Sequence, residues 1–291
     1  MKNWKDIIQY TQFRYLDHTE QKTFQHRPYT ALTSFAIDDA LLDRADDRST
    51  ASMRLWVHPK TIVLGIVDTR VPYIHEGVNM LADQGYHVIV RNSGGLAVAL
   101  DEGVLNVSLI LPDVKKFSIY DCYEAMVQFV QYMLSDLTND IEAYEIVGSY
   151  CPGDYDLSIH GKKFAGISQR RIKNGAAVQI YLDVEGNTQK RATLIRKFYD
   201  VSIKNESTRF NYPTVNPQTM ASLSELLGVH LTVDEMKSRV LTTLQHFNEH
   251  VIIETNGLSP KQLHAFDRRF KQMIKRNKQI AHMQSIDIES L

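Results

Sequence analysis

Cysteine is scarce in this chain, which has Cys122 and Cys151 as its two thiols among 291 residues. Two cysteines cannot build the disulfide framework of a small secreted protein, so we expect a protein of the reducing cytoplasm. The first residues also lack the continuous apolar stretch of a secretory signal, which agrees with that expectation.

Long apolar runs, a surplus of positive charge and phosphate-binding loops are missing as well. Because no stretch of about 18 uncharged apolar residues occurs, we expect no membrane partner. The 33 basic and 34 acidic residues nearly cancel, whereas nucleic-acid binders usually carry a basic surplus, so we expect no nucleic-acid partner. Neither G-x-x-x-x-G-K-[ST] nor G-x-G-x-x-G occurs, which excludes the two standard nucleotide-phosphate loops.

The hydrophobic pattern of the first half indicates a mixed fold. With 43% hydrophobic residues over 291 positions, the chain suits one large domain, or one domain with an appendage. The opening segment has a helical pattern, and Ser34 is a candidate N-cap for a helix over residues 34–45. A β-branched run at 61–67, a helical pattern at 73–83 and a strand at 86–91 then form a strand–helix–strand unit.

The second half predicts a group of strands followed by helices. We expect a helix over residues 117–134 and strands over 104–111, 145–148, 155–159, 164–170 and 176–183. Because turns containing glycine separate several of these strands, we predict an α+β fold of mixed, mainly antiparallel sheets packed with helices. After about residue 190 the pattern is helical, and the last helix carries seven Lys/Arg between Lys261 and Lys278. That run is typical of a solvated helix face, with a docking surface for an acidic protein as the alternative.

Two segments hold residues suited to chemistry. The first, Arg91-Asn-Ser-Gly-Gly-Leu-Ala-Val98, follows a predicted strand, and its adjacent glycines let backbone N–H groups approach a ligand closely. The second, residues 148–171, places Cys151 before Pro-Gly, where we expect a loop to present the thiol.

A thiol needs a partner before it becomes a good nucleophile. The thiolate is the reactive form, and an ordinary cysteine with a pKa near ~8.5 is only about 3% ionised at pH 7. Lys163, which two predicted strands bring back towards Cys151, and His160 are both candidate partners, and the pattern alone does not choose between them. Cys122 lies in a turn-to-helix segment and is interpreted as a small buried hydrophobe.

A metal-ligand spacing also occurs in the chain. His246-Phe-Asn-Glu249-His250 matches the H-x-x-E-H pattern of one metalloprotease class. Such short matches arise by chance in polar helices, and no convincing further ligand is evident. We therefore expect these residues to be helix surface and predict no metal site.

Taken together, the segments resemble the lipoate–protein ligase and octanoyltransferase superfamily, which has the biotin/lipoate ligase catalytic fold. The resemblance rests on the order and spacing of segments 34–41, 61–66, 91–98, 103–108 and 161–170. It implies a catalytic domain over residues 35–250, with residues 1–34 as an N-terminal helical segment packed on it. Residues 251–291 are then a helical C-terminal extension.

The resemblance also implies a role for each candidate site residue. Cys151 is implied to be the nucleophile that carries an acyl-thioester, and Lys163, in the family's Lys-x-x-Gly pattern, to lower the pKa of its thiol. Lys162 alternates to the other face of the strand. Substrate binding is implied for Arg91, Ser93, Gly94, Gly95, Asn106 and Gly166.

Departures from the usual motifs indicate the branch of the superfamily. Lipoate ligases generally lack a cysteine at the place of Cys151 and activate their acid with ATP. Enzymes that load octanoate from acyl carrier protein have Arg-Arg-x-Thr-Gly-Gly and a later His-Asp. This chain has Arg91-Asn-Ser-Gly-Gly and Leu100-Asp101 instead, which is similar to the amidotransferase branch.

That branch implies ping-pong transfer of octanoate, in lipoate biosynthesis, without ATP or any other cofactor. The donor is the lysine of octanoylated glycine cleavage H protein, and the acceptors are lipoyl domains of 2-oxo-acid dehydrogenase E2 subunits. Octanoyl-acyl-carrier-protein transfer, lipoate ligation and a non-catalytic lipoyl-domain chaperone are the alternatives. Donor preference tests the first, ATP dependence the second, and thiol alkylation that leaves transfer intact the third.

Overall fold

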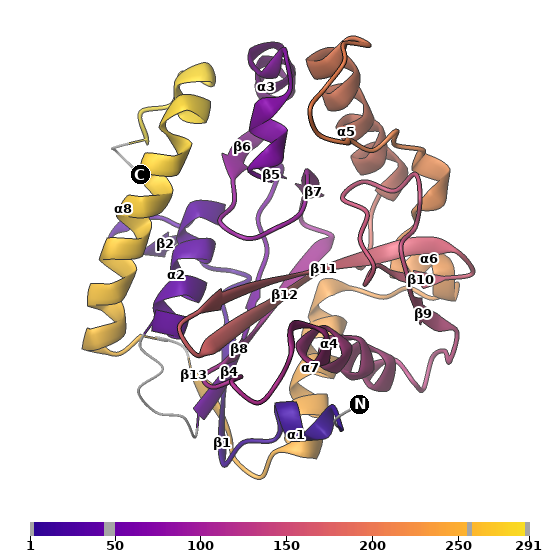
Figure 1. Cartoon of the computed structure of the whole chain (residues 1–291). Coiled ribbons are helices and arrows are strands. Elements are labelled where there is room, and N and C mark those ends of the chain that lie inside the picture. The colour runs from indigo at the N-terminus through magenta and orange to yellow at the C-terminus, as the bar shows by residue number, and fades with distance from the viewer. Residues whose placement is uncertain (1–2, 44–49, 255–257, 289–291) are drawn as a thin grey trace.

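The computed structural model describes residues 3–43, 50–254 and 258–288. Within them, an eight-stranded sheet with the order β13-β1-β4-β8-β12-β11-β10-β9 runs through the middle of the molecule (Figure 1). β1 is parallel to β13 and β4, and the other neighbours are antiparallel. The strands are β1 (Gln12–Asp17), β4 (Thr50–Trp56), β8 (Val104–Leu111), β9 (Ile141–Ala143), β10 (Leu157–Ile159), β11 (Lys162–Ile172), β12 (Gly175–Asp183) and β13 (Val251–Glu254).

Two smaller sheets complete the strands of the described residues. The order β6-β5-β7 joins β5 (Thr61–Leu64) and β6 (His87–Val90) in parallel, with β7 (Val98–Leu100) antiparallel on the other side of β5. Helix α3 (Ile74–Asp83) connects β5 to β6, so the predicted strand–helix–strand unit is confirmed. β2 (Thr23–Phe24) and β3 (Arg27–Pro28) form a short hairpin.

Helices cover both faces of the large sheet (Figure 1). On one face the apolar core includes residues of α1 (Lys5–Ile8), α4 (Ile119–Met133), α6 (Leu223–Leu227) and α7 (Val233–Phe247). On the other it includes residues of α2 (Ala31–Asp43), α3, α5 (Thr188–Ile203), α8 (Pro260–Met283) and the three-stranded sheet. No helix in the described part of the chain is long and apolar enough to cross a membrane. The predicted α+β class with mainly antiparallel sheets is confirmed.

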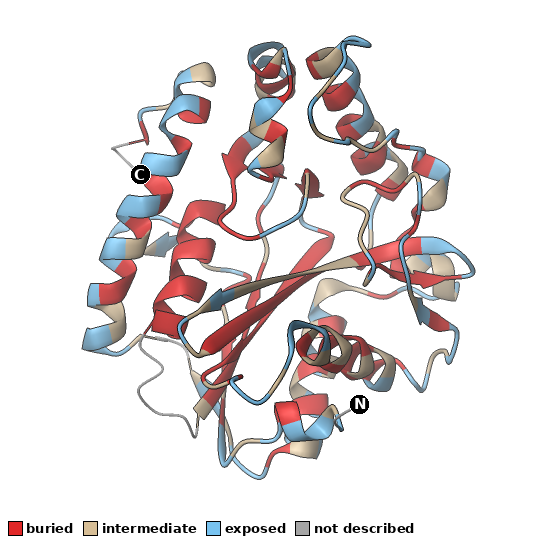
Figure 2. Ribbon diagram, in the orientation of Figure 1, coloured by how far each residue is buried: buried red, intermediate tan, exposed pale blue. Residues whose placement is uncertain are grey.

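Strand β8 shows how the sequence divides the two faces. Successive side chains of a strand point to opposite faces, and β8 reads Val-Leu-Asn-Val-Ser-Leu-Ile-Leu. Asn106 and Ser108 therefore share the face towards α2, where Ser108 donates a hydrogen bond to Asp38. The alternate residues fill the core beside α4 and α7: Leu105, Val107, Leu109 and Leu111. Central strands and α2 are the most continuously buried elements (Figure 2).

Helix α2 is buried along its whole length, although it contains three aspartates. A buried carboxylate is stable when a cation or hydrogen-bond donor meets it. Asp38 receives the Arg54 guanidinium at 2.8 Å, and Asp39 receives Arg170 of β11 at 2.5 Å. These ion pairs fix α2 against the sheet at the level of the site described below.

The N-terminal predictions need correction. The opening segment is helical at Lys5–Ile8 alone within the described residues, and residues 12–17 form β1 inside the large sheet. The early helix starts at Ala31, so Ser34 is not its N-cap but a buried residue of its second turn. The Ser34 hydroxyl bonds Tyr29 and His58 instead. The last predicted residues of that helix, 44 and 45, lie outside the described residues.

Two further predictions are wrong in part. Residues 145–148 are not a strand, because the strand of this region is β9 and a loop follows it. The C-terminal extension is helical in α8, but its start at Val251–Glu254 is a strand that pairs with β1. Both ends of the chain therefore contribute to one edge of the large sheet.

Candidate active site

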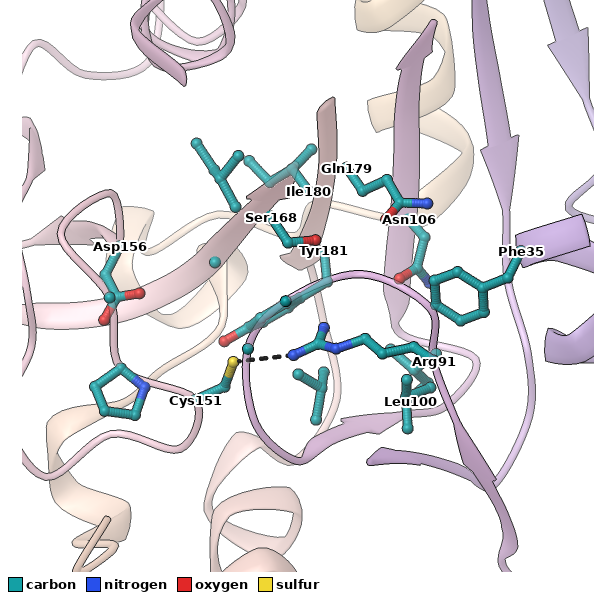
Figure 3. A pocket seen from close by; sticks show the side chains of 18 of the residues that line it. Phe35, Arg91, Leu100, Asn106, Cys151, Asp156, Ser168, Gln179, Ile180 and Tyr181 are labelled. Atoms are coloured by element: carbon teal, nitrogen blue, oxygen red, sulfur yellow. Dashed lines mark hydrogen bonds between the residues drawn. The ribbon is translucent and has the colours of Figure 1, made fainter. Parts of the chain in front are cut away.

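A cavity of about 190 Å³ opens beside Cys151, between the large sheet, the three-stranded sheet and the loop after β6 (Figure 3). Its lining residues come from β4, β5, β7, β8, β11, β12, α2 and α4, and from the loops that carry Arg91 and Cys151. Its apolar and aromatic lining includes Phe35, Trp56, Val63, Val98, Leu100, Ile167, Ile180 and Tyr181. A pocket of this composition suits a short apolar chain.

Cys151 lies in the loop between β9 and β10, at the side of the cavity. Its backbone has a φ of 47°, a left-handed conformation that a non-glycine residue adopts at some energetic cost. The Sγ atom accepts hydrogen bonds from the backbone N–H of Leu96 at 3.2 Å and from Arg91 Nη2 at 3.3 Å (Figure 3). Two donors therefore converge on the sulfur.

Glycines allow the loop after β6 to come this close to the sulfur. Gly95 has a φ of +100°, and a Cβ on it would lie 2.2 Å from Arg91 Nη2 and 3.0 Å from Cys151 Sγ. A Cβ on Gly65 would lie 1.9 Å from the carbonyl oxygen of Gly95. Side chains at either position would displace the loop, which explains why glycine occupies both.

Buried polar contacts anchor the same loop from both sides. Arg170, already paired with Asp39, donates from Nη1 to the carbonyl oxygen of Asn92 at 2.9 Å. At the other end, Ala97 N–H donates to the Tyr199 hydroxyl, which itself donates to Asp68 at 2.8 Å. Burial raises the pKa of Asp68 to about 6, and the hydrogen bonds from Tyr199 and the Gly65 N–H and the charge of Arg91 oppose that rise. The loop is thus fixed to α2, β11 and α5.

Lys163 is fully buried behind the loop that carries Cys151. Its ammonium donates to the carbonyl oxygens of Tyr150 at 2.9 Å and Cys151 at 2.8 Å, and it pairs with Asp156 at 2.8 Å. Burial raises the pKa of Asp156, and the Lys163 charge opposes that rise. The hydrogen bonds of the ammonium go to oxygen atoms, so Lys163 holds the backbone of Cys151 and does not bond its sulfur.

Polar groups border the cavity at the end away from the sulfur. Gln179 donates to Asp38 at 2.7 Å, which leaves its Oε1 buried without a hydrogen-bond partner. Asn106 lies beside it (Figure 3) and donates to the Trp56 carbonyl at 3.3 Å. These groups and Phe35 border the cavity on the side towards α2.

The other candidate residues lie outside the cavity, and the prediction that Glu249 and His250 belong to a helix surface is wrong. His160 is at the exposed turn between β10 and β11 and faces Asp140 at 3.9 Å, away from the cavity lining. Cys122 is buried in α4. His246 is in α7, which ends at Phe247, so Glu249 and His250 do not continue its face. No group of potential metal ligands was found in the described residues.

Most of the predicted site residues meet in one place. Cys151, Arg91, Gly94, Gly95, Asn106 and Gly166 line the cavity. Lys163 and Ser93 do not: Lys163 supports the Cys151 loop from behind, and Ser93 is buried with its hydroxyl unpaired. Lys162 is exposed on the opposite face of β11, as predicted.

Sequence reasoning missed the contributions of β12 and α2. Tyr181 and Gln179 face the cavity, and their register partners on β8 are Asn106 and Ser108. Asn106 was a predicted site residue, so the pairing of β12 with β8 was the signal that could have located Tyr181 and Gln179. Phe35 gives no such local signal, since α2 is buried on every side and its pattern does not mark the face that meets the cavity.

A family model and two curated relatives place this chain among the same group of proteins. The family model described as the lipoyl protein ligase A/B catalytic domain matches residues 30–245. The Octanoyl-[GcvH]:protein N-octanoyltransferase of Oceanobacillus iheyensis is 59% identical over 278 residues, which are 95% of this chain and 99% of that protein. The protein of the same name from Anoxybacillus flavithermus is 48% identical, over 94% of this chain and 97% of that protein.

Solved structures share the fold at low sequence identity. A chain from the structure of a bipartite lipoate protein ligase and its E2 lipoyl domain, from Thermoplasma acidophilum, is 18% identical with a TM-score of 0.64, covering 91% of this chain and 93% of that one. Lipoate-protein ligase A bound with ATP is 16% identical with a TM-score of 0.66, covering 90% and 95%.

Proposed function

The chain belongs to the lipoyl protein ligase A/B catalytic domain family, and on that premise we propose that it is a protein N-octanoyltransferase. It takes the octanoyl group from octanoylated glycine cleavage H protein and passes it to the lysine of E2 lipoyl domains, in lipoate biosynthesis in the cytoplasm. The names of relatives up to 59% identical over nearly the whole chain support the reaction and its donor.

Cys151 is the nucleophile of this reaction. The observation that carries its assignment is the position of Sγ, which lies beside an apolar cavity with two hydrogen-bond donors directed at it. The octanoyl chain enters the cavity, where each buried methylene contributes about 0.8 kcal/mol. The thiolate attacks the amide carbonyl to form a thioester, and the freed lysine of the donor leaves as an amine. An acceptor lysine then attacks the thioester.

No nucleotide is needed for this exchange. One lysine amide is replaced by another of almost equal free energy, so the difficulty is the low reactivity of the amide carbonyl. The enzyme therefore has to activate the sulfur and stabilise the charge that moves to the carbonyl oxygen.

Lys163 supports the nucleophile through its backbone. The ammonium holds the Cys151 carbonyl in a loop whose φ at Cys151 is 47°, and this contact fixes the direction in which the thiol points. The predicted effect of Lys163 on the ionisation of the thiol stays a prediction. The ammonium is already paired with Asp156, which opposes such an effect.

Mass spectrometry of the protein after exposure to octanoylated H protein tests the proposal. We expect one hydroxylamine-labile octanoyl group on Cys151, and its transfer to an apo lipoyl domain in buffer without ATP. Cys151→Ala should abolish both steps, whereas Cys122→Ala should retain them. Full transfer by Cys151→Ala would refute the thioester, and a protein that accepts octanoate from acyl carrier protein alone would belong to the other octanoyltransferase branch.

A further inference from the structure

We infer that Arg91 and the backbone N–H of Leu96 form the anion site of the reaction. They hold the Cys151 sulfur while it is a thiolate, and they stabilise the carbonyl oxygen once the charge has moved there. This inference deepens the proposed function and rests on it, because it assigns a catalytic role to a residue otherwise expected to bind substrate.

The first support is geometry. Arg91 Nη2 lies 3.3 Å and Leu96 N 3.2 Å from Sγ, so both donors meet the sulfur at hydrogen-bond distances for a large, soft acceptor. The same Nη2 donates to the Leu96 carbonyl at 2.7 Å, which fixes the guanidinium to the loop that supplies the second donor. The site is therefore rigid before any substrate enters.

The second support is the balance of charge among the buried cations. Lys163 has a carboxylate partner, Asp156, at 2.8 Å. Arg91 is 7% exposed, and its hydrogen bonds go to the Leu96 carbonyl and the Cys151 sulfur, while its Nε is buried without a partner. Removing a guanidinium from water is costly unless an anion compensates it. The sulfur of Cys151, as a thiolate, is the hydrogen-bonded anion that the site provides.

The third support is the path of the charge during attack. The sulfur electron pair forms the S–C bond, and the π pair of the amide carbonyl moves to its oxygen. The carbonyl oxygen belongs to the carbon atom that the sulfur attacks, so its negative charge develops close to the sulfur. The N–H donors that held the thiolate are therefore placed to bond this oxygen. When the C=O bond re-forms, the C–N bond breaks and the lysine nitrogen leaves as a neutral amine after taking one proton from water.

Other ionisable groups face Cys151 from each neighbouring element, and they bear on any pH profile. They are Lys163 of β11, Asp156 of the Cys151 loop, Asp68 after β5, Tyr123 of α4, Tyr181 of β12 and Tyr199 of α5. Burial raises the pKa of each tyrosine, so all three stay neutral over the range in which the thiol is assayed. Burial raises the pKa of Asp68 to about 6 and the Arg91 charge opposes that rise, so Arg91→Gln should raise the Asp68 pKa further, whereas Arg91→Lys keeps the positive charge.

The test measures the pH profile of Cys151 alkylation by iodoacetamide and, separately, the rate of acyl-enzyme formation from octanoylated H protein. Arg91→Gln should move the alkylation midpoint upward by about one pH unit or more, and slow acyl-enzyme formation by about 100-fold or more. Arg91→Lys should keep most of the alkylation profile but still lose at least about tenfold in acylation, because an ammonium does not reproduce the guanidinium fork. The matched control is Arg70→Gln, an exposed arginine outside the cavity lining.

The outcomes separate this inference from the proposed function. An unchanged alkylation midpoint in Arg91→Gln, or a larger shift in Lys163→Met than in Arg91→Gln, overturns the inference. If Arg91→Gln does not fold, as judged by thermal unfolding, Arg91→Lys decides, and native acylation rates in it count against the inference. If the native protein takes no octanoyl group from H protein while its alkylation still depends on Arg91, the proposed function fails and the anion site stands.

Discussion

Replacing Lys163 by methionine removes a buried cation without changing the length of the side chain much. In the native protein the ammonium meets the Cys151 carbonyl and the Asp156 carboxylate, both at 2.8 Å. The side chain of Asp156 is 2% exposed, so the variant leaves its carboxylate in the interior without a counter-ion. Breaking a buried ion pair in this way costs about 3–5 kcal/mol of folding free energy.

The folding free energy lost in Lys163→Met should depend on pH, and the surroundings of Asp156 determine whether the loss grows or shrinks as pH rises. Burial raises the pKa of this carboxyl, and Lys163 is the main opposing influence, so its removal raises the pKa further. A carboxyl whose folded pKa exceeds its unfolded value binds protons more tightly in the native state. Stability is therefore greatest below the unfolded pKa of about 4 and is lost as pH rises through the folded value. We expect the Lys163→Met penalty to be smaller at pH 5 than at pH 8, by about 1 kcal/mol or more.

Urea denaturation of the native protein and Lys163→Met, at pH 5 and pH 8, measures both quantities. Lys162→Met is the matched control, because Lys162 is exposed on the opposite face of β11 and should cost less than about 0.5 kcal/mol at either pH. Adding Asp156→Asn to Lys163→Met should recover part of the loss at pH 8. A penalty under about 1 kcal/mol, or one that is equal at both pH values, would show that the pair is not the buried support assigned to it.

Two other predictions test the loop and a buried histidine. Gly95→Ala places a Cβ 2.2 Å from Arg91 Nη2 and 3.0 Å from Cys151 Sγ, so acyl-enzyme formation, followed by mass spectrometry, should fall at least about tenfold. Gly94→Ala, whose Cβ meets no atom within 4 Å, should lose less; equal losses would contradict the reasoning. His58 is buried with a pKa lowered to about 3 by burial and by Arg54, so it contributes stability that is present above pH 6.5 and lost as pH falls towards 3. In urea titrations at pH 4, His58→Gln should remove about 3 kcal/mol of the acid-induced loss of folding free energy. The part of that loss that comes from His18, whose pKa is also lowered to about 3, should remain. Identical acid profiles for the native protein and His58→Gln would count against a neutral His58.

The elements with a clear period were predictable from the sequence, and those that depend on distant partners were not. β8 alternates between core residues and the polar pair Asn106 and Ser108, and its predicted bounds match the observed strand. β1, in contrast, was predicted as helix. Its neighbours in the sheet are residues 50–55 on one side and 251–254 on the other. Pairing with a segment more than two hundred residues away outweighed the local helical preference.

The site followed a similar division. Motifs and family resemblance located Cys151, Arg91, Gly95 and Asn106, all of which line the cavity. The remaining walls come from surfaces that meet only in the folded chain, such as Phe35 of α2, so no local motif marks them. The strand register between β8 and β12 is the one inference that would have extended the prediction to Tyr181.

The two buried cations near Cys151 show why spacing along the chain does not determine which charge acts on the sulfur. Lys163 follows Cys151 by twelve residues, and the hairpin of β10 and β11 returns it to the Cys151 carbonyl. The same loop also supplies Asp156, which pairs with the ammonium and reduces the field it exerts on the thiol. Arg91 is sixty residues away in sequence, yet it contacts the sulfur, and among the described residues its hydrogen bonds go to that sulfur and to the Leu96 carbonyl. In a low-dielectric interior the net charge around the sulfur decides its reactivity, and the guanidinium is the positive charge that is hydrogen-bonded directly to it.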